Sequence, residues 1–407
     1  MKKKWLLSFT ILLFGLTTYV QATPIFASKY NLKCKTCHTL TPTLNKTGLM
    51  FLRNGFRFSK NDKTMIEAFL DANSSTDRVL PIHGLVGTNI DTKNRNDIEK
   101  LNLYFGGSVS ETLSIYAVTR STFNQPVDHK LFAESNSRAF VQWNPKGDKH
   151  VIKVGWVDPL GMFSNLNRTL MDNALMGSGL LKKAPKSILK PEWVHKNPPP
   201  PPGEDATASE IKAYNLAIMP KQPYLLPVAY AGTGFVKGIE YSYLYDNKAL
   251  FLFNYGIPSS PRYADNDDTE LTVGIELKDF SGYNFGLLYM HQKIANIETD
   301  SYILPIEKEF LSGDMLFQQS FVYKDTNQFE NPYYGSQTTL TYQIDDESQL
   351  RAILAFDQDE AEEFNSGYSL TYSKSWNDRI LVHLTGVRHK GAYFDESLAK
   401  LSIYLFL

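Results

Sequence analysis

The sequence predicts a mainly β fold: an antiparallel β-barrel of the outer-membrane type, preceded by a small α-helical domain. Apolar and polar residues alternate with a period of two through most of the chain from about Val79 onward. The chain holds 25 Phe, 23 Tyr and 5 Trp although its mean hydropathy is only -0.29. After the N-terminal segment, no stretch approaches the roughly 18 uninterrupted apolar residues of a spanning helix. These three observations together are typical of a transmembrane barrel.

Fifteen segments carry the alternation clearly, and they are rich in the β-branched and aromatic residues that favour strands. Turn-forming residues separate them, for example at Tyr245–Lys248, Lys278–Gly282 and Asp345–Ser348. The predicted strands cover residues 79–90, 98–108, 113–121, 132–143, 150–158, 234–245, 248–257, 268–277, 283–294, 314–323, 333–342, 349–357, 366–375, 379–388 and 400–407.

Connector length predicts the strand number and the orientation. Outer-membrane barrels have short periplasmic turns, longer outer loops and, in single bacterial chains, an even number of strands. The alternation of long and short connectors breaks between Asn296 and Gly313, and a further strand from Tyr302 to Phe310 restores it together with an even count. We therefore predict 16 strands over residues 79–407, with 14 and 18 as the neighbouring even alternatives. A soluble β-sandwich is the alternative fold.

The first 22 residues have the pattern of a secretory signal peptide. Three lysines at positions 2–4 precede an apolar run from Trp5 to Leu16, and Ala22 ends a small-residue cleavage site. An uncleaved anchor helix is the alternative for this segment. The formal net charge of -1 does not favour a nucleic-acid partner, and two cysteines are too few for a disulfide scaffold.

Both cysteines fall in one five-residue string, Cys34-Lys35-Thr36-Cys37-His38, which is the attachment signature of a c-type haem. In that chemistry the two thiols add to the vinyl groups of the haem, and the adjacent histidine binds the iron as its proximal ligand. A zinc site would need further cysteine or nearby histidine ligands, and the next histidine is His83. A thioredoxin-like redox pair would need an α/β pattern that the chain lacks. We predict one covalent haem c on Cys34, Cys37 and His38, in a domain spanning residues 23–78.

The residues around this string resemble the monohaem domain of the fused cytochrome–porins, the Cyc2-like iron oxidases. The resemblance covers about Pro24 to Phe58, and beyond it the likeness is one of layout. That family joins such a domain to an outer-membrane barrel in one chain, so the resemblance implies electron transfer with ferrous iron as the donor. The residues that carry it are Pro24-Ile25-Phe26-Ala27, Pro42, Leu44-Asn45, Gly48, Phe51 and Asn54-Gly55-Phe56.

No motif fixes the sixth ligand of the haem iron. Met50 lies in a predicted helical run from Thr43 to Phe51, and Met65 lies in a second run from Lys63 to Ala72. Met50 or Met65 is the candidate distal ligand because a thioether can bind haem iron, and apolar packing is the alternative role for each. His83, where the barrel begins, is the weakest candidate.

Two features of the predicted outer loops bear on function. Residues 159–233 form a long loop with the proline run Pro198 to Pro202, a stiff extended segment. Three other loops are acidic, and their carboxylates are hard ligands for Fe²⁺, with surface hydration as the alternative role. The acidic residues are Asp91 and Asp97; Asp265, Asp267, Asp268 and Glu270; and Asp357, Asp359, Glu360, Glu362 and Glu363.

A redox group and a barrel in one chain predict an electron carrier. A hydrocarbon core about 30 Å thick insulates electrons, and a 16-stranded barrel is wide enough to admit a plug. We expect the haem domain in the lumen or on the periplasmic side of the outer membrane. There it would relay electrons between an extracellular donor, ferrous iron by the resemblance, and periplasmic carriers such as soluble cytochromes. With that donor the chain would be a ferrous iron:cytochrome oxidoreductase.

Two other functions fit the same sequence. The chain is alternatively a diffusion porin with a periplasmic haem appendage, or a carrier that transfers electrons outward. Lysines at positions 29, 33 and 35 form either a docking patch for an acidic carrier or plain solvated charge. No arrangement of catalytic residues for hydrolysis is found, and membrane lipid is the only other partner that the sequence implies.

Overall fold

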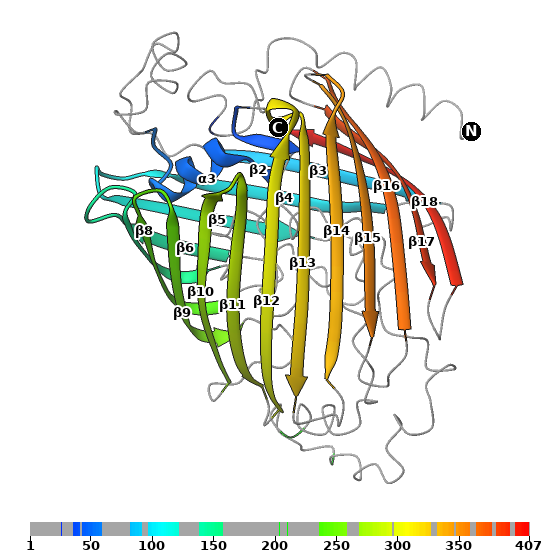
Figure 1. The fold of residues 1–407 in the computed structure, drawn as a ribbon. Helices are drawn as coiled ribbons and strands as arrows, with labels where there is room; N and C mark the ends of the chain where they lie inside the picture. Colours follow the sequence, from blue (N-terminus) through cyan, green and yellow to red (C-terminus); the bar gives the residue numbers. More distant parts are fainter. Residues whose placement is uncertain are drawn as a thin grey trace, which may run out of the picture.

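Sixteen antiparallel strands, β3 to β18, close into one barrel in the computed structural model (Figure 1). Each strand pairs with its neighbours along the chain, and β18 pairs with β3 to close the ring. The predicted number of strands is therefore confirmed. The structure describes residues 26, 36–40, 43–58, 82–91, 97–121, 138–157, 203, 210, 236–258, 268–294, 297–326, 332–345, 347–358, 364–376, 380–390 and 395–406.

The predicted strands match the observed ones closely. The added strand that restored the even count is β12. It ends at Phe310 as predicted, but it begins at Ile297 rather than at Tyr302. The strands are β3 (Ile82–Asp91), β4 (Asp97–Ser108), β5 (Leu113–Ser121), β6 (Arg138–Trp143), β7 (His150–Val157), β8 (Val236–Tyr245), β9 (Ala249–Pro258), β10 (Thr269–Phe280), β11 (Tyr283–Ile294), β12 (Ile297–Phe310), β13 (Met315–Thr326), β14 (Tyr333–Gln343), β15 (Ser348–Gln358), β16 (Phe364–Trp376), β17 (Ile380–Lys390) and β18 (Asp395–Phe406).

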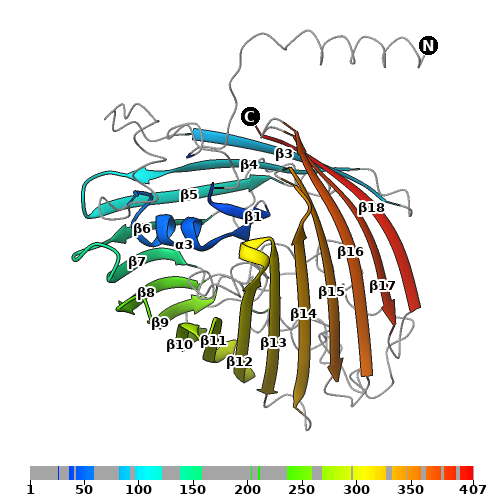
Figure 2. The ribbon, with the colours of Figure 1, turned by 45° about the horizontal axis from the view of Figure 1, so that its top comes forward.

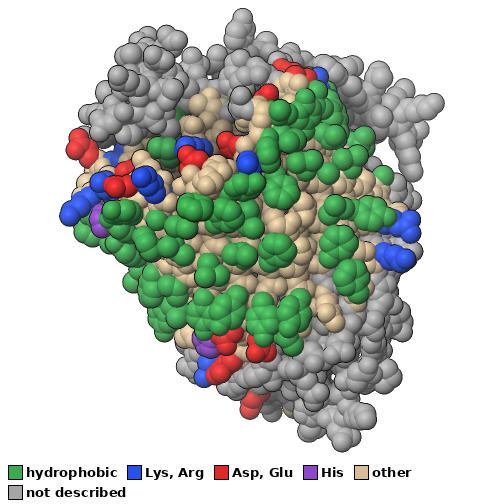
Figure 3. All heavy atoms as spheres, in the orientation of Figure 1, with side chains coloured by type: hydrophobic (Ala, Val, Ile, Leu, Met, Phe, Trp, Pro, Cys, Tyr) green, Lys and Arg blue, Asp and Glu red, His purple; other side chains and the backbone are tan. Residues whose placement is uncertain are grey.

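The two faces of the wall differ in chemistry. On β8, Ile239 and Tyr241 point outward and are 51% and 38% exposed, whereas Glu240 and Ser242 point inward and are buried. Hydrophobic side chains form a broad band over the outside of the strands, and charged side chains gather at its upper and lower edges (Figure 3). An apolar exterior with a largely polar interior is the pattern of a barrel that faces lipid.

The two ends of the barrel differ in their connections. One end, called here the short-turn end, carries connections of two to six residues, together with the first residue of β3 and the last of β18. The predicted turns at Tyr245–Lys248, Lys278–Gly282 and Asp345–Ser348 all lie there. The opposite, long-loop end carries the connection 158–235, of which the structure describes only Gly203 and Glu210.

An N-terminal segment lies inside the barrel near the short-turn end (Figure 2). It contains the short strands β1 (His38–Leu40) and β2 (Thr43–Leu44) and the helix α3 (Lys46–Arg53). The helical run was predicted to begin at Thr43, but Thr43 and Leu44 pair with β1 and the helix begins after Asn45. The predicted signal peptide, the predicted helix at 63–72 and the linker at 73–78 lie outside the described residues. No described helix is long and apolar enough to cross a membrane.

Candidate haem site

Asn45 joins the cysteine–histidine string to helix α3. Its side-chain oxygen accepts a hydrogen bond from Gly48 N (2.9 Å), which caps the helix, and its side-chain amide donates to Thr36 O (3.2 Å). Its backbone N–H donates to Cys37 O (2.9 Å). An asparagine cap satisfies backbone donors that the first turn of a helix leaves unpaired. One residue therefore holds the described part of the cysteine–histidine string against the start of the helix.

Helix α3 lies directly against Cys37 because residue 48 is a glycine. A Cβ atom at Gly48 would collide with the carbonyl oxygen of Cys37. His38, the next residue, is half-buried and stands opposite Leu44 in the pairing of β1 with β2. The predicted proximal ligand is thus placed beside the start of α3.

The environment of Cys37 does not suit a redox-active thiol pair. Burial raises the pKa of the Cys37 thiol to about 11, whereas reactive thiols have a lowered pKa. Cys37 is the one cysteine that the structure describes, and it is not in a disulfide. The partner Cys34 and the candidate ligand Met65 lie outside the described residues.

Aromatic rings of the N-terminal segment pack against one another and reach the barrel wall. The ring of Phe26 lies 5.0 Å from that of Phe51 and 5.0 Å from that of Phe56, measured between centroids. Phe51 also contacts Phe58 at 4.8 Å, and Phe56 stacks on Tyr116 of β5 at 5.6 Å. Such contacts stabilise beyond the area that they bury. The aromatic residues therefore fasten the segment to the inner wall.

The end of α3 turns Phe56 back onto the helix. Gly55 N donates to Leu52 O (3.1 Å) and Phe56 N donates to Phe51 O (2.9 Å), which is a Schellman motif. Gly55 has a φ of 67°, which glycine adopts without strain, and its Cα faces the Ser114 hydroxyl of β5. The Asn54-Gly55-Phe56 string that resembles the known family is therefore the helix terminator and part of the contact with the barrel.

Arg53 is the charged anchor of the segment. Its side chain is only 5% exposed, and its guanidinium donates to Ser242 Oγ (3.0 Å) on β8 and to Lys149 O (3.0 Å) in the β6–β7 connection. Burial lowers the pKa of Arg53 to about 10, although the negative charges of Asp148 and Glu240 act in the opposite direction and raise it. The guanidinium thus stays charged at neutral pH.

The barrel wall also caps the last carbonyls of α3. Gln142 on β6 donates from its side-chain amide to Leu52 O (3.1 Å) and Arg53 O (2.9 Å). Asn144 donates to Arg53 O (2.9 Å). A helix leaves its last carbonyls without intrahelical donors, so side chains of the barrel replace them here. The sequence analysis did not identify Arg53, Gln142 or Asn144. The feature that could have indicated Arg53 is a positively charged residue at the end of an otherwise apolar helical run.

Met50 leaves α3 on the side away from Cys37. It follows Gly48 by two residues, and two residues in a helix turn the side-chain direction by about 200°. Gly48 contacts Cys37, so this placement does not favour Met50 as the distal ligand. His83 lies in β3, and its side chain is outside the described part of the structure.

Two of the predicted loop carboxylates lie elsewhere than expected. Asp268 and Glu270 are 3% and 0% exposed, and Glu270 accepts a hydrogen bond from Gln292 (2.6 Å) on the inner wall. The strand predicted over 268–277 already contains both residues, and in β10, which begins at Thr269, Glu270 lies on the buried face of the strand. Asp91, Asp97 and Asp357 lie in strands, and the other acidic loop residues are not described. Within the described residues, no three His, Cys, Asp or Glu side chains could together hold a metal ion.

A haem c, implied by the string at 34–38, fits the described residues. Cys37 is free for a thioether bond, His38 follows it, and phenylalanine rings pack together within the same N-terminal segment. The lack of a side chain at Gly48 lets α3 lie directly against Cys37. When bound, the haem would supply a one-electron carrier whose potential depends on its ligands and burial.

Comparison with solved structures gives the fold. Salmonella typhi OmpF, solved in complex with daunomycin, matches with a TM-score of 0.51 and 10% identity, over 81% of this chain and 98% of that one. A loop-deletion mutant of the Vibrio cholerae outer membrane protein OmpT matches with a TM-score of 0.50 and 8% identity, over 81% and 99%. The fold is that of outer-membrane porins. No protein-family model and no curated protein matches the chain.

Proposed function

We propose that this chain is an outer-membrane cytochrome that carries electrons across the membrane between an extracellular donor and periplasmic carriers. One covalent haem c on Cys34, Cys37 and His38 would be the carrier. Ferrous iron is the donor that the family resemblance favours. The short-turn end would face the periplasm, as in barrels of this class.

The observation that carries this proposal is the docking of α3 on the inner wall. Arg53, Gln142 and Asn144 form a buried polar network that joins the haem-attachment segment to β6 and β8. A loosely tethered periplasmic appendage would have no need of such contacts. Attachment inside the barrel would instead hold a redox group toward the insulating layer, where a carrier is needed.

The burial of the inner wall supports the same proposal. Glu240, Asn254, Thr272 and Ser301 all point inward, and each is 0% exposed. In a wide water-filled channel these polar side chains would be in contact with solvent. The burial of these side chains favours a filled lumen over an open pore along this part of the wall.

Loss of the haem-attachment chemistry tests the assignment. In the Cys34→Ser/Cys37→Ser double variant we expect no covalent haem, and in His38→Ala we expect the low-spin spectrum to be lost. The barrel should still assemble, because its hydrogen-bond ladder closes on itself without the segment. Haem staining of denatured protein measures attachment, and gel mobility with and without heating measures assembly. A haem-stained band of parental intensity in the double variant would contradict the proposal.

The porin fold itself favours a second candidate, a diffusion porin with a haem appendage. Conductance across a planar bilayer separates the two functions. A large steady conductance of the haem-loaded protein favours the porin, whereas little conductance together with oxidation or reduction of the haem by an external reagent favours the electron carrier.

A further inference from the structure

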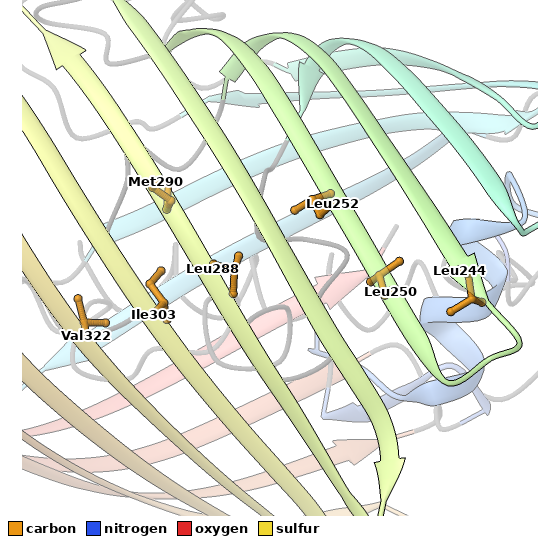
Figure 4. Close-up of a cluster of buried hydrophobic side chains, with 7 residues drawn as sticks. All are labelled: Leu244, Leu250, Leu252, Leu288, Met290, Ile303 and Val322. Carbon is orange, nitrogen blue, oxygen red and sulfur yellow. The ribbon is translucent and has the colours of Figure 1, made fainter.

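The outer face of β15 to β18 carries a hollow that its side chains do not fill. On the inner wall, by contrast, the apolar cluster from β8 to β13 is closed, because each of its seven side chains is 6% exposed or less (Figure 4). The hollow has a volume of about 720 Å³, within the roughly 300–1,000 Å³ of ligand pockets. We call it the outer hollow, and the outward-facing residues that line it include Ala352, Tyr368, Leu370, Gly386, Arg388 and Ala399.

The floor of the outer hollow lies in one register row across the four strands. Ala352 pairs with Leu370, Leu370 with Gly386, and Gly386 with Ala399. A Cβ atom at Gly386 would meet nothing within 4 Å, so the space over this position is open. Leu370 and Tyr368 are 53% and 46% exposed and stand up from the wall beside it. The outer hollow is therefore an open apolar depression in the lipid-facing surface.

A row of tyrosines marks the level at which the apolar band ends toward the long-loop end. The ring of Tyr323 lies 6.0 Å from that of Tyr302 and 5.3 Å from that of Tyr334. Tyrosines gather where lipid chains meet the headgroups. Counted from the short-turn end of each strand, Tyr302 is eight residues from Phe310, and Tyr323 is eight residues from Met315.

Arg388 lies at the same level on β17. It is eight residues from Ile380, where β17 begins at the short-turn end. Its side chain is exposed on the outer face, as is that of Lys390 two residues further on. An arginine can hold a phosphate through two parallel hydrogen bonds. The outer hollow is thus apolar toward the membrane centre and basic at its headgroup edge.

We propose that the outer hollow binds a phosphorylated glycolipid of the outer leaflet, with an acyl chain in the hollow and a phosphate on Arg388. The apolar floor matches the chain, and the positive charges match the headgroup. Only the choice of leaflet rests on the proposed function, because the short-turn end was assigned to the periplasm there. The site itself does not depend on the haem.

Two exposed alanines give a matched test of the acyl-chain site. Ala399 lies in the outer hollow, whereas Ala139 lies on the outer face of β6 and does not line it. The full-length protein in detergent is mixed with diphosphorylated lipid A, and native mass spectrometry measures the bound lipid. Ala399→Leu should weaken binding about tenfold, since it displaces a few methylene groups of the chain. Ala139→Leu should bind as the parent does.

A second pair of variants tests the headgroup site. Arg388→Gln should weaken lipid A binding about tenfold, because it removes a charge-assisted hydrogen bond to phosphate. Lys374→Gln removes a charge near the short-turn end of β16, outside the outer hollow, and should leave binding unchanged. Lipid A without phosphates should bind the parent no better than diphosphorylated lipid A binds Arg388→Gln. Inorganic phosphate should not displace the lipid, since it lacks the chain.

Parental binding by both Ala399→Leu and Arg388→Gln would overturn the inference, as would equal losses in the Ala139→Leu and Lys374→Gln controls. So would a lipid-free parent that is oligomeric while Ala399→Leu is monomeric, because the hollow would then hold a second copy. Tighter binding of phosphatidylglycerol than of lipid A would contradict the choice of ligand. If Ala399→Leu fails to assemble, Gly386→Leu replaces it, because the space there is open. None of these outcomes depends on the haem, so a failure here is distinguishable from a failure of the proposed electron transfer.

Discussion

At the scale of single residues, Arg53 makes the most consequential contact. A buried guanidinium needs acceptors for its donors, and here a serine hydroxyl of the barrel accepts from Nη1 and a backbone carbonyl accepts from Nη2. Its own carbonyl accepts from Gln142 and Asn144. The same residue thus holds the segment through both its side chain and its backbone.

Arg53→Ala should release the segment from the wall. Each lost hydrogen bond to the charged group costs about 1.5–3 kcal/mol, and Ser242 Oγ would be left buried without this donor. Limited proteolysis of the assembled protein should then cut residues before β3 faster than in the parent. Arg57→Ala is the matched control, because the bond from Arg57 to Ser110 O is exposed and contributes little. Equal cleavage of the two variants would show that Arg53 does not anchor the segment.

At the scale of elements, the terminator of α3 sets the geometry of docking. The positive φ of Gly55 ends the helix and directs Phe56 onto Phe26 and Tyr116. Gly55 is also in close contact with Ser114. Its positive φ therefore ends the helix, and its lack of a side chain allows the close approach to β5.

Gly55→Ala should weaken docking more than Gly147→Ala. Both glycines have a positive φ, 67° and 63°, at which alanine costs about 1–2 kcal/mol. A Cβ at Gly55 would also press on Ser114 Oγ, whereas nothing lies within 4 Å at Gly147. The thermal transition of the haem absorbance should therefore shift down further for Gly55→Ala. Shifts of equal size would mean that backbone strain alone accounts for the effect.

Most strands of the barrel were predictable from the sequence. The first residues of β18, β12 and α3 were not, and the structure shows the reason in each case. Period-two alternation located β3 to β18, but β18 begins at Asp395 rather than at residue 400 because its polar start pairs with β17 beyond the apolar band. β12 was harder to recognise, since only residues 295–296 separate it from β11 where a long outer loop was expected. Asn45 begins α3 later than predicted, because its capping bond competes with continued helix.

At the scale of the whole molecule, the sequence predicted the two parts but not how they join. Arg53 and Ser242 are 189 residues apart, and no local pattern relates them. The cluster of buried apolar side chains on the inner wall, which includes Leu250 and Leu252, did leave a signal. The run Leu250-Phe251-Leu252-Phe253 is apolar on both faces, which a strand between lipid and water would not be. Such a run indicates that the inner face packs against something apolar.

The central claim is that electrons cross the membrane through this chain. The direct measurement uses liposomes that contain the protein and a trapped soluble c-type cytochrome, with a membrane-impermeant ferrous chelate added outside. We expect the trapped cytochrome to be reduced with the parent protein and not to be reduced above the protein-free rate with the Cys34→Ser/Cys37→Ser variant. No reduction by a parent protein that carries its haem, or equal reduction by the variant, would contradict it.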